Sequence, residues 1–290
     1  MSRIRPRYFA FFAALFFASV GWTASLDQGI KQYEGRHYSA AREIFNEVER
    51  EHGPSLETDF YLGRIALWFD ELSVGLPHLE RCARLAPQRA EFQNALGDAC
   101  GLAAQNANIF AKLGWAKRCL AAYERAVELE PQNPAWRWSL IGYYTNAPRL
   151  AGGGMEKAYA QAAEIRRLDA ASGRVAFATL YLADSREAEA FAEFEPMLRD
   201  SPDDFFALYH VGRCAALSGQ QLDRGIAALR RCLALPEPVP IAGMPSYANV
   251  HYRLGNLLQK KGCAEEAKLE YARATAADVD FRPAKVALKN

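Results

Sequence analysis

The chain carries an internal repeat of 34 residues, which constrains its fold more than any other feature. Gly29, Gly63 and Gly97 are 34 residues apart, and the last two each follow a leucine. The same Leu-Gly pair recurs at Leu254 and Gly255. A fixed period of this length is typical of stacked helical hairpins, because one hairpin alone cannot bury its apolar face.

Each glycine is followed by a second pattern, in which small and large apolar residues recur three or four positions apart, often before a proline. The clearest copies are Ala41/Phe45/Val48, Leu79/Cys82/Pro87, Tyr123/Ala126/Pro131, Ala190/Phe194/Pro202 and Ala267/Tyr271/Ala274. This spacing places the residues on one face of a helix. On these residues the sequence resembles the tetratricopeptide repeat (TPR) family, whose 34-residue unit has the pattern W-x2-L-G-x2-Y, then A-x3-F-x2-A, then P. The resemblance covers residues 26 to 280 and implies an all-α, right-handed α-solenoid.

We predict one solenoid domain over residues 26–290, with seven hairpins that begin near residues 26, 56, 90, 134, 171, 205 and 248. The third hairpin has an insert near 101–118, which predicts longer helices or an added turn because it lacks proline and is rich in helix-forming residues. The fourth has an insert near 147–155. A proline-rich linker covers 236–245, and no run of residues shows the alternation of a β-strand.

The stretch "APRLAGGGMEKA", residues 147 to 158, superficially resembles a phosphate-binding loop. A nucleotide-binding loop of the Walker type would follow a strand and end in Lys-Ser or Lys-Thr. Here a helical stretch precedes Pro148, and alanine follows Lys157. We therefore interpret the stretch as a turn between helices, with an anion site at Gly152, Gly153, Gly154 and Lys157 as the alternative.

Residues 1–25 have the layout of a secretory signal peptide. Three arginines precede an apolar run from Tyr8 to Val20, and small residues follow. The run is shorter than the roughly 20 residues that span a bilayer. We expect an exported protein in the periplasm or outside the cell, cleaved after Ser25 or Gly21, with an uncleaved N-terminal anchor as the alternative.

Composition argues against nucleic acid and metal as ligands. Without Arg3, Arg5 and Arg7, 32 of the 35 basic residues remain against 34 acidic ones, so the remaining chain is close to neutral and has no basic cluster. The six cysteines form no C-x-x-C pair and no zinc-site spacing with histidine. Cys100 and Cys119 can form a disulfide if their helices pair, and buried free thiols are the alternative.

No catalytic constellation is recognisable, so we predict that the protein is not an enzyme and needs no cofactor. The five histidines are scattered, one to a region, without an H-E-x-x-H motif, and no serine lies in a G-x-S-x-G motif. Acidic pairs such as Glu265 and Glu266 fall at expected helix starts, where they complement the helix dipole.

The resemblance implies that partners bind along the concave surface, which the first helix of each hairpin lines. With the Leu-Gly pair at repeat positions seven and eight, positions five and nine lie one turn apart on one helix face. Aromatic and arginine side chains at such positions suit peptide binding, although an aromatic there can also pack between hairpins. The candidate partner-binding residues are Phe60, Arg64, Trp138, Tyr209, Arg213, Tyr252 and Asn256. Of the Lys/Asn set with which one TPR subclass clamps a C-terminal carboxylate, only Asn256 is present.

These observations leave two functions open. The first is a non-enzymatic scaffold that binds a protein or peptide in its concave groove. The second is a small-molecule carrier, or accessory protein of a transporter, with a pocket formed by the irregular third and fourth hairpins. The chain is similar in this respect to exported TPR-like accessory proteins of solute transporters, but it lacks their lipid-attachment cysteine.

Overall fold

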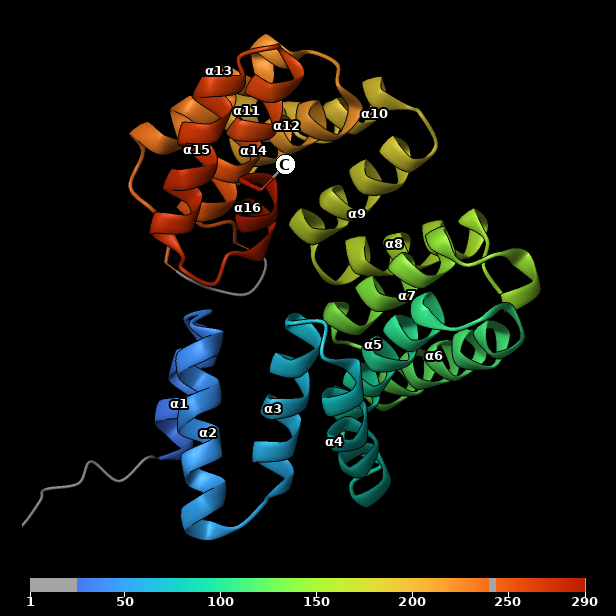
Figure 1. The fold of residues 1–290 in the computed structure, drawn as a ribbon. Helices are drawn as coiled ribbons and strands as arrows, with labels where there is room; N and C mark the ends of the chain where they lie inside the picture. Colours follow the sequence, from blue (N-terminus) through green and yellow to red (C-terminus); the bar gives the residue numbers. More distant parts are fainter. Residues whose placement is uncertain (1–24, 240–243, 290) are drawn as a thin grey trace, which may run out of the picture.

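Successive helical hairpins build the whole of the described chain (Figure 1). The structure is a computed structural model that describes residues 25–239 and 244–289. Over these residues it is helical, with no β-strand. The proposed signal segment lies outside the described residues, apart from Ser25, and so do residues 240–243 of the proline-rich linker. No helix in the described part is both long and apolar enough to cross a membrane.

The seven predicted hairpins are confirmed, and each begins within one residue of its predicted start. Hairpin 1 comprises α1 (Leu26–Glu34) and α2 (Tyr38–His52), hairpin 2 α3 (Leu56–Trp68) and α4 (Leu72–Leu85), hairpin 3 α5 (Ala90–Asn106) and α6 (Ile109–Leu129), and hairpin 4 α7 (Pro134–Asn146) and α8 (Met155–Leu168). Hairpin 5 comprises α9 (Ala170–Ala183), α10 (Glu187–Ala192) and α11 (Glu195–Asp200), hairpin 6 α12 (Phe205–Ser218) and α13 (Leu222–Ala234), and hairpin 7 α14 (Tyr247–Lys260) and α15 (Ala264–Ala277). A short helix, α16 (Arg282–Ala287), follows.

The recurring glycine marks the point where the two helices of a hairpin approach most closely. A Cβ atom at Gly97 would lie 2.4 Å from the ring of Tyr123, and one at Gly255 would lie 2.5 Å from the ring of Tyr271. Any side chain on the first helix would therefore displace the large residue of the second. The 34-residue period thus records one packing contact that is repeated along the chain.

The two irregular hairpins differ from the others in different ways. In hairpin 3 the insert lengthens both helices, to 17 residues in α5 and 21 in α6. In hairpin 4 it forms a loop with one 3-10 turn, η1 (Arg149–Ala151), between α7 and α8. Gly152 in this loop has a φ of +92°, and a Cβ at Gly153 would lie 1.8 Å from the carbonyl oxygen of Ala147, so both positions require glycine.

The hairpins are stacked along a curve that has an inner and an outer layer. The first helices α1, α3, α5, α7, α9, α12 and α14 contact one another in sequence, and each second helix packs against the first helix of the next hairpin. On the tighter side of a curve, successive hairpins are closer together, so each helix there contacts the equivalent helix of the hairpin before it and of the hairpin after it. The first helices therefore form the inner wall of the solenoid.

Seven hairpins bring the two ends of the solenoid together, so that α1 and α2 face α16 (Figure 1). The backbone N–H and the hydroxyl of Ser39, in the first turn of α2, donate to the Asp280 carboxylate at 2.8 and 2.9 Å. Arg282 donates to the carbonyl of Trp68, at the end of α3, at 2.8 Å and pairs with Asp70. The Asp280 carboxylate thus lies at the N-terminus of α2 and the Arg282 guanidinium at the C-terminus of α3. The dipoles of the two helices favour these charges at these ends. We call these contacts the clasp.

Candidate functional site

The candidate partner-binding aromatics lie on the inner-wall helices, but two of them are buried. Phe60 is 8% exposed and its ring centre lies 5.2 Å from that of Phe92, in the next hairpin. Tyr209 is 7% exposed and packs edge-on against His210. With so little surface to offer a partner, these two rings chiefly pack within the solenoid, and that of Phe60 joins hairpins 2 and 3.

The other candidates keep exposed surface or pack at an end of the solenoid. Arg64 is exposed and lies over the Phe60 ring, with 5.4 Å from its Cζ to the ring centre. Trp138 is half-buried and lines a cavity. Half-buried Tyr252 contacts the rings of Tyr271 and Phe281, and Asn256 accepts a hydrogen bond from the Tyr271 hydroxyl at 2.9 Å.

Arg213 belongs to a group of basic side chains that has no acidic partner among the described residues. It is half-buried on α12 and donates to the Thr179 hydroxyl at 3.1 Å. Burial and the nearby Arg253 guanidinium lower the pKa of Arg213. Arg253, on α14, lies over the Tyr252 ring and has a buried Nε without a hydrogen-bond partner in this part of the chain. We call Arg213, Arg253 and His210 the basic cluster.

His210 remains neutral within the basic cluster. Its ring stacks on Phe194 at 5.2 Å between ring centres, and its Nδ1 is buried without a hydrogen-bond partner among the described residues. Burial, followed by the charges of Arg213 and Arg253, holds the pKa of His210 well below its usual value. A buried site that keeps an imidazole neutral and two guanidiniums unpaired is one in which an anion would be stabilised.

A cavity of about 890 Å³ lies between hairpins 3 and 4. It is bounded by α5, α6, α7 and the loop that contains η1. The residues that line it include Asp98, Tyr123, Trp138 and Gly142. Asp98 follows the Leu96-Gly97 pair directly and so occupies repeat position nine, but its hydrogen bond with Tyr123 could not be read from the pattern.

The glycine-rich loop uses its polar groups internally. The amides of Gly152, Gly153 and Gly154 donate to the carbonyl oxygens of Arg149, Pro148 and Tyr144. The Lys157 ammonium donates to the carbonyl of Gly152 at 2.9 Å. These interactions favour the turn interpretation, since an anion would have to compete for groups that already have partners.

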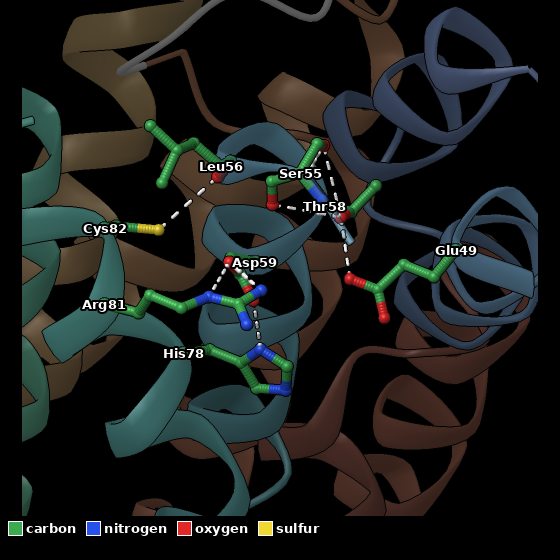
Figure 2. A network of polar contacts seen from close by, with 8 residues as sticks. All are labelled: Glu49, Ser55, Leu56, Thr58, Asp59, His78, Arg81 and Cys82. Carbon is green, nitrogen blue, oxygen red and sulfur yellow. Dashed lines mark hydrogen bonds and ion pairs between the residues drawn. The ribbon is translucent and has the colours of Figure 1, made fainter. Parts of the chain in front are cut away.

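A buried network joins α3 to α4 and contains residue types that catalyse reactions elsewhere (Figure 2). The Asp59 carboxylate contacts His78 Nδ1 at 2.7 Å and is paired with Arg81, and Cys82 lies one turn beyond His78. The Cys82 Sγ donates to the carbonyl of Leu56, and burial raises the pKa of this thiol to about 12. A buried, protonated thiol is a poor nucleophile, so the arrangement serves to join the helices.

The six cysteines are free thiols in the structure, and all but half-buried Cys263 are buried. Cys100 and Cys119, which the sequence had suggested as a disulfide or as buried thiols, occupy the same apolar cluster, formed by hairpins 3 to 5. Burial raises the pKa of Cys119 to about 12. In the described part of the chain, no group of three or more His, Cys, Asp or Glu residues could hold a metal ion.

Comparison with known proteins relates this architecture to one fold. No protein-family model matches the chain, and no curated protein matches it. A thermophilic TPR protein from Thermus thermophilus has a TM-score of 0.55 and 21% identity, over 65% of this chain and 96% of that one. A tetratricopeptide repeat protein from Parabacteroides merdae has a TM-score of 0.55 and 14% identity, over 91% of this chain and 96% of that one. At these identities the likeness establishes the fold alone, and the protein is an α-solenoid with the fold of TPR proteins.

Proposed function

We propose that the protein is a non-enzymatic scaffold that binds an acidic segment of a protein partner along its inner wall. The observation that carries this proposal is the pair of arginines in the basic cluster, Arg213 and Arg253, which face no carboxylate among the described residues. Arg64 adds an exposed guanidinium on the same wall. Other arginines, such as Arg81, Arg89 and Arg231, are paired with acids.

Unpaired charge in a half-buried site is unfavourable. Two guanidiniums close together in a half-buried site repel each other, and their contacts among the described residues include a hydroxyl and an aromatic ring but no carboxylate. A carboxylate from a partner would accept charge-assisted hydrogen bonds from both, and each such bond contributes about 1.5–3 kcal/mol. The side chains needed for recognition are therefore already in place, and a glutamate or aspartate of the partner would complete the site.

A direct test compares two labelled peptides. A fluorescein-labelled peptide of alternating Glu and Gly should bind the protein at least about tenfold more tightly than its Gln counterpart, because one charged hydrogen bond is worth that factor. The double variant Arg213→Gln, Arg253→Gln should lose this difference in fluorescence anisotropy titrations. The matched control Arg125→Gln, Arg231→Gln, which alters two arginines of the second helices α6 and α13, should keep it. Equal binding of both peptides to the unaltered protein would contradict the proposal.

Small-molecule carriage is a second candidate function, and one observation favours it. The cavity between hairpins 3 and 4 has a volume within the roughly 300–1,000 Å³ typical of small-molecule sites. It lies between the two hairpins whose inserts depart from the repeat. This function does not depend on the basic cluster, which lies on α12 and α14.

We also propose that the protein is exported and acts in the periplasm or outside the cell. The support is the sequence of residues 1–25, with its basic start, apolar run and small residues. N-terminal sequencing of the protein recovered from the periplasmic fraction should begin at Leu26 or Trp22. A chain that begins at Met1 or Ser2 and fractionates with the cytoplasm would contradict export.

A further inference from the structure

The cavity between hairpins 3 and 4 exists because both hairpins deviate from the regular repeat. The extra turns of α5 and α6 extend beyond the neighbouring hairpins, and the loop after α7 turns away before α8 begins. Three helices and the loop therefore border a concave space that is open to solvent on one side.

The walls of this space are largely apolar. Leu113, Ala116, Trp138 and Tyr143 line it, and Ile109 and Leu150, each 80% exposed, lie among its lining residues. Large apolar side chains that are exposed around a concavity are unfavourable in water. Burying them contributes a free energy of about 25 cal/mol for each Å² of apolar surface removed from water. A ligand with an apolar body would cover them.

Gly142 keeps part of this space open. It lies in the middle of α7, and a Cβ built there would meet no atom within 4 Å. Glycine inside a helix costs about 0.5–1 kcal/mol relative to alanine, and no neighbouring side chain requires it here. By contrast, the repeat glycines such as Gly97 are required by direct contact with the second helix. The open position at Gly142 faces the cavity, where a bound molecule can approach the helix backbone.

Asp98 supplies the one carboxylate among the residues that line the cavity. Its Oδ1 accepts a hydrogen bond from the Tyr123 hydroxyl at 2.8 Å. Its Oδ2 has no hydrogen-bond partner among the described residues, and the side chain keeps some exposed surface. Burial raises the pKa of Asp98, and the hydrogen bond from Tyr123 and the charge of Arg64 offset this only in part. The carboxylate therefore has one free oxygen in an apolar enclosure, where a positive partner would stabilise it most.

The other charged group of the lining, Lys112, lies on exposed surface in the first turn of α6. Water already solvates its ammonium, so it gains less from a ligand than Asp98 does. We propose that the cavity binds an apolar small molecule that carries an amine, with its ammonium group donating to Asp98 Oδ2 and its apolar body against Leu113, Trp138 and Leu150. This inference rests on small-molecule carriage as the function of the cavity and names the class of ligand.

Three fluorescent probes of one size test the ligand class. Dansylcadaverine carries a free amine, its N-acetyl derivative is neutral, and dansyl-6-aminohexanoate carries a carboxylate. The amine should bind the unaltered protein at least about tenfold more tightly than the neutral probe, the factor that one charge-assisted hydrogen bond provides. In Asp98→Asn the amide oxygen can still accept a hydrogen bond from Tyr123. This variant should lower the affinity for the amine probe to that for the neutral probe.

A pair of glycine variants tests the location. Gly142→Phe should fill the cavity and abolish binding of the amine, whereas Gly114→Phe adds the same ring to α6 at a position with open space that is not part of the lining. Both variants should keep the helical circular dichroism of the unaltered protein. Retained binding in Gly142→Phe, or equal loss in both variants, would contradict the site.

The outcomes separate this inference from the functions on which it depends. If the amine and neutral probes bind equally and Asp98→Asn changes nothing, the ligand class is wrong and carriage stands. If none of the probes binds, both the ligand class and the carriage function are contradicted. If the protein prefers the carboxylate probe and this preference disappears in Lys112→Gln, the ligand is an anion held by Lys112, which contradicts the amine proposal. Binding of the acidic peptide by the inner wall should be unaffected by Gly142→Phe, so failure of the cavity leaves that proposal intact.

Discussion

Replacing Asp59 by alanine should lower the free energy of unfolding by about 3–5 kcal/mol, the range for breaking a buried ion pair by removing one partner. The Asp59 side chain is 1% exposed, and its two oxygens contact His78 and the Arg81 guanidinium (Figure 2). Without the carboxylate, both basic groups of α4 lose their partner on α3. The adjacent Thr58 hydroxyl donates to Glu49 on α2 at 2.7 Å, so the network also connects hairpins 1 and 2.

Urea denaturation followed by far-UV circular dichroism measures this effect. The matched control is Asp203→Ala, which removes an acid from an exposed ion pair with Arg231 and should leave the free energy of unfolding nearly unchanged, because water screens such a pair. Since a loss of 3–5 kcal/mol can unfold a marginally stable protein, Arg81→Gln provides a milder variant with a loss in the same direction. Equal losses in Asp59→Ala and Asp203→Ala would show that the network is not a buried ion pair in solution.

The order and start of the hairpins could be predicted because the repeat records a local contact. Gly29 and Phe45 are 16 residues apart, as are Gly255 and Tyr271, because in each pair the ring packs on the glycine. Such a contact needs only the two helices of one hairpin, which are neighbours in sequence. The insert of hairpin 3 predicted longer helices or an added turn, since it lacks proline, and the structure has the longer helices.

The clasp could not be predicted from this pattern. Ser39 and Asp280 are 241 residues apart, and their meeting depends on curvature that accumulates over seven hairpins. Asp280 and Arg282 follow the last full hairpin, where the repeat no longer constrains residue type. A small change in the angle between successive hairpins would separate the two ends.

The candidate site was predicted only in part, for a geometric reason. Repeat position indicates that Arg64 and Arg213 lie on first helices, here α3 and α12, but it does not say whether an aromatic side chain one turn earlier points into the groove. Phe60 and Tyr209 are buried against neighbouring side chains. The sequence suggested a pocket at hairpins 3 and 4 but not the residues that line it, because these depend on how far α5 and α6 extend past α7. Gly142, a glycine in mid-helix without a repeat partner, was the available signal.

Opening the clasp should change the shape of the protein more than any other surface substitution. Asp280 is 5% exposed and accepts two charge-assisted hydrogen bonds from Ser39, while Arg282 contacts Trp68 and Asp70. Together these contacts are worth several kcal/mol, at about 1.5–3 kcal/mol for each charged hydrogen bond. In the double variant Asp280→Ala, Arg282→Ala, the hydrogen bond from Arg36 to Asn249 at 3.2 Å remains between hairpins 1 and 7. Without the clasp this contact should not hold the two ends together, and the ring should open into a curved rod with its helices intact.

Small-angle X-ray scattering of the unaltered protein and this double variant tests the closed ring, on which the enclosed inner wall depends. The unaltered protein should scatter as the closed ring, and the double variant should show a larger radius of gyration and maximum dimension with unchanged circular dichroism. Lys285→Ala, which removes an exposed lysine from α16, should scatter like the unaltered protein. An unaltered protein that scatters as an open rod, or a double variant with the same dimensions, would contradict the account.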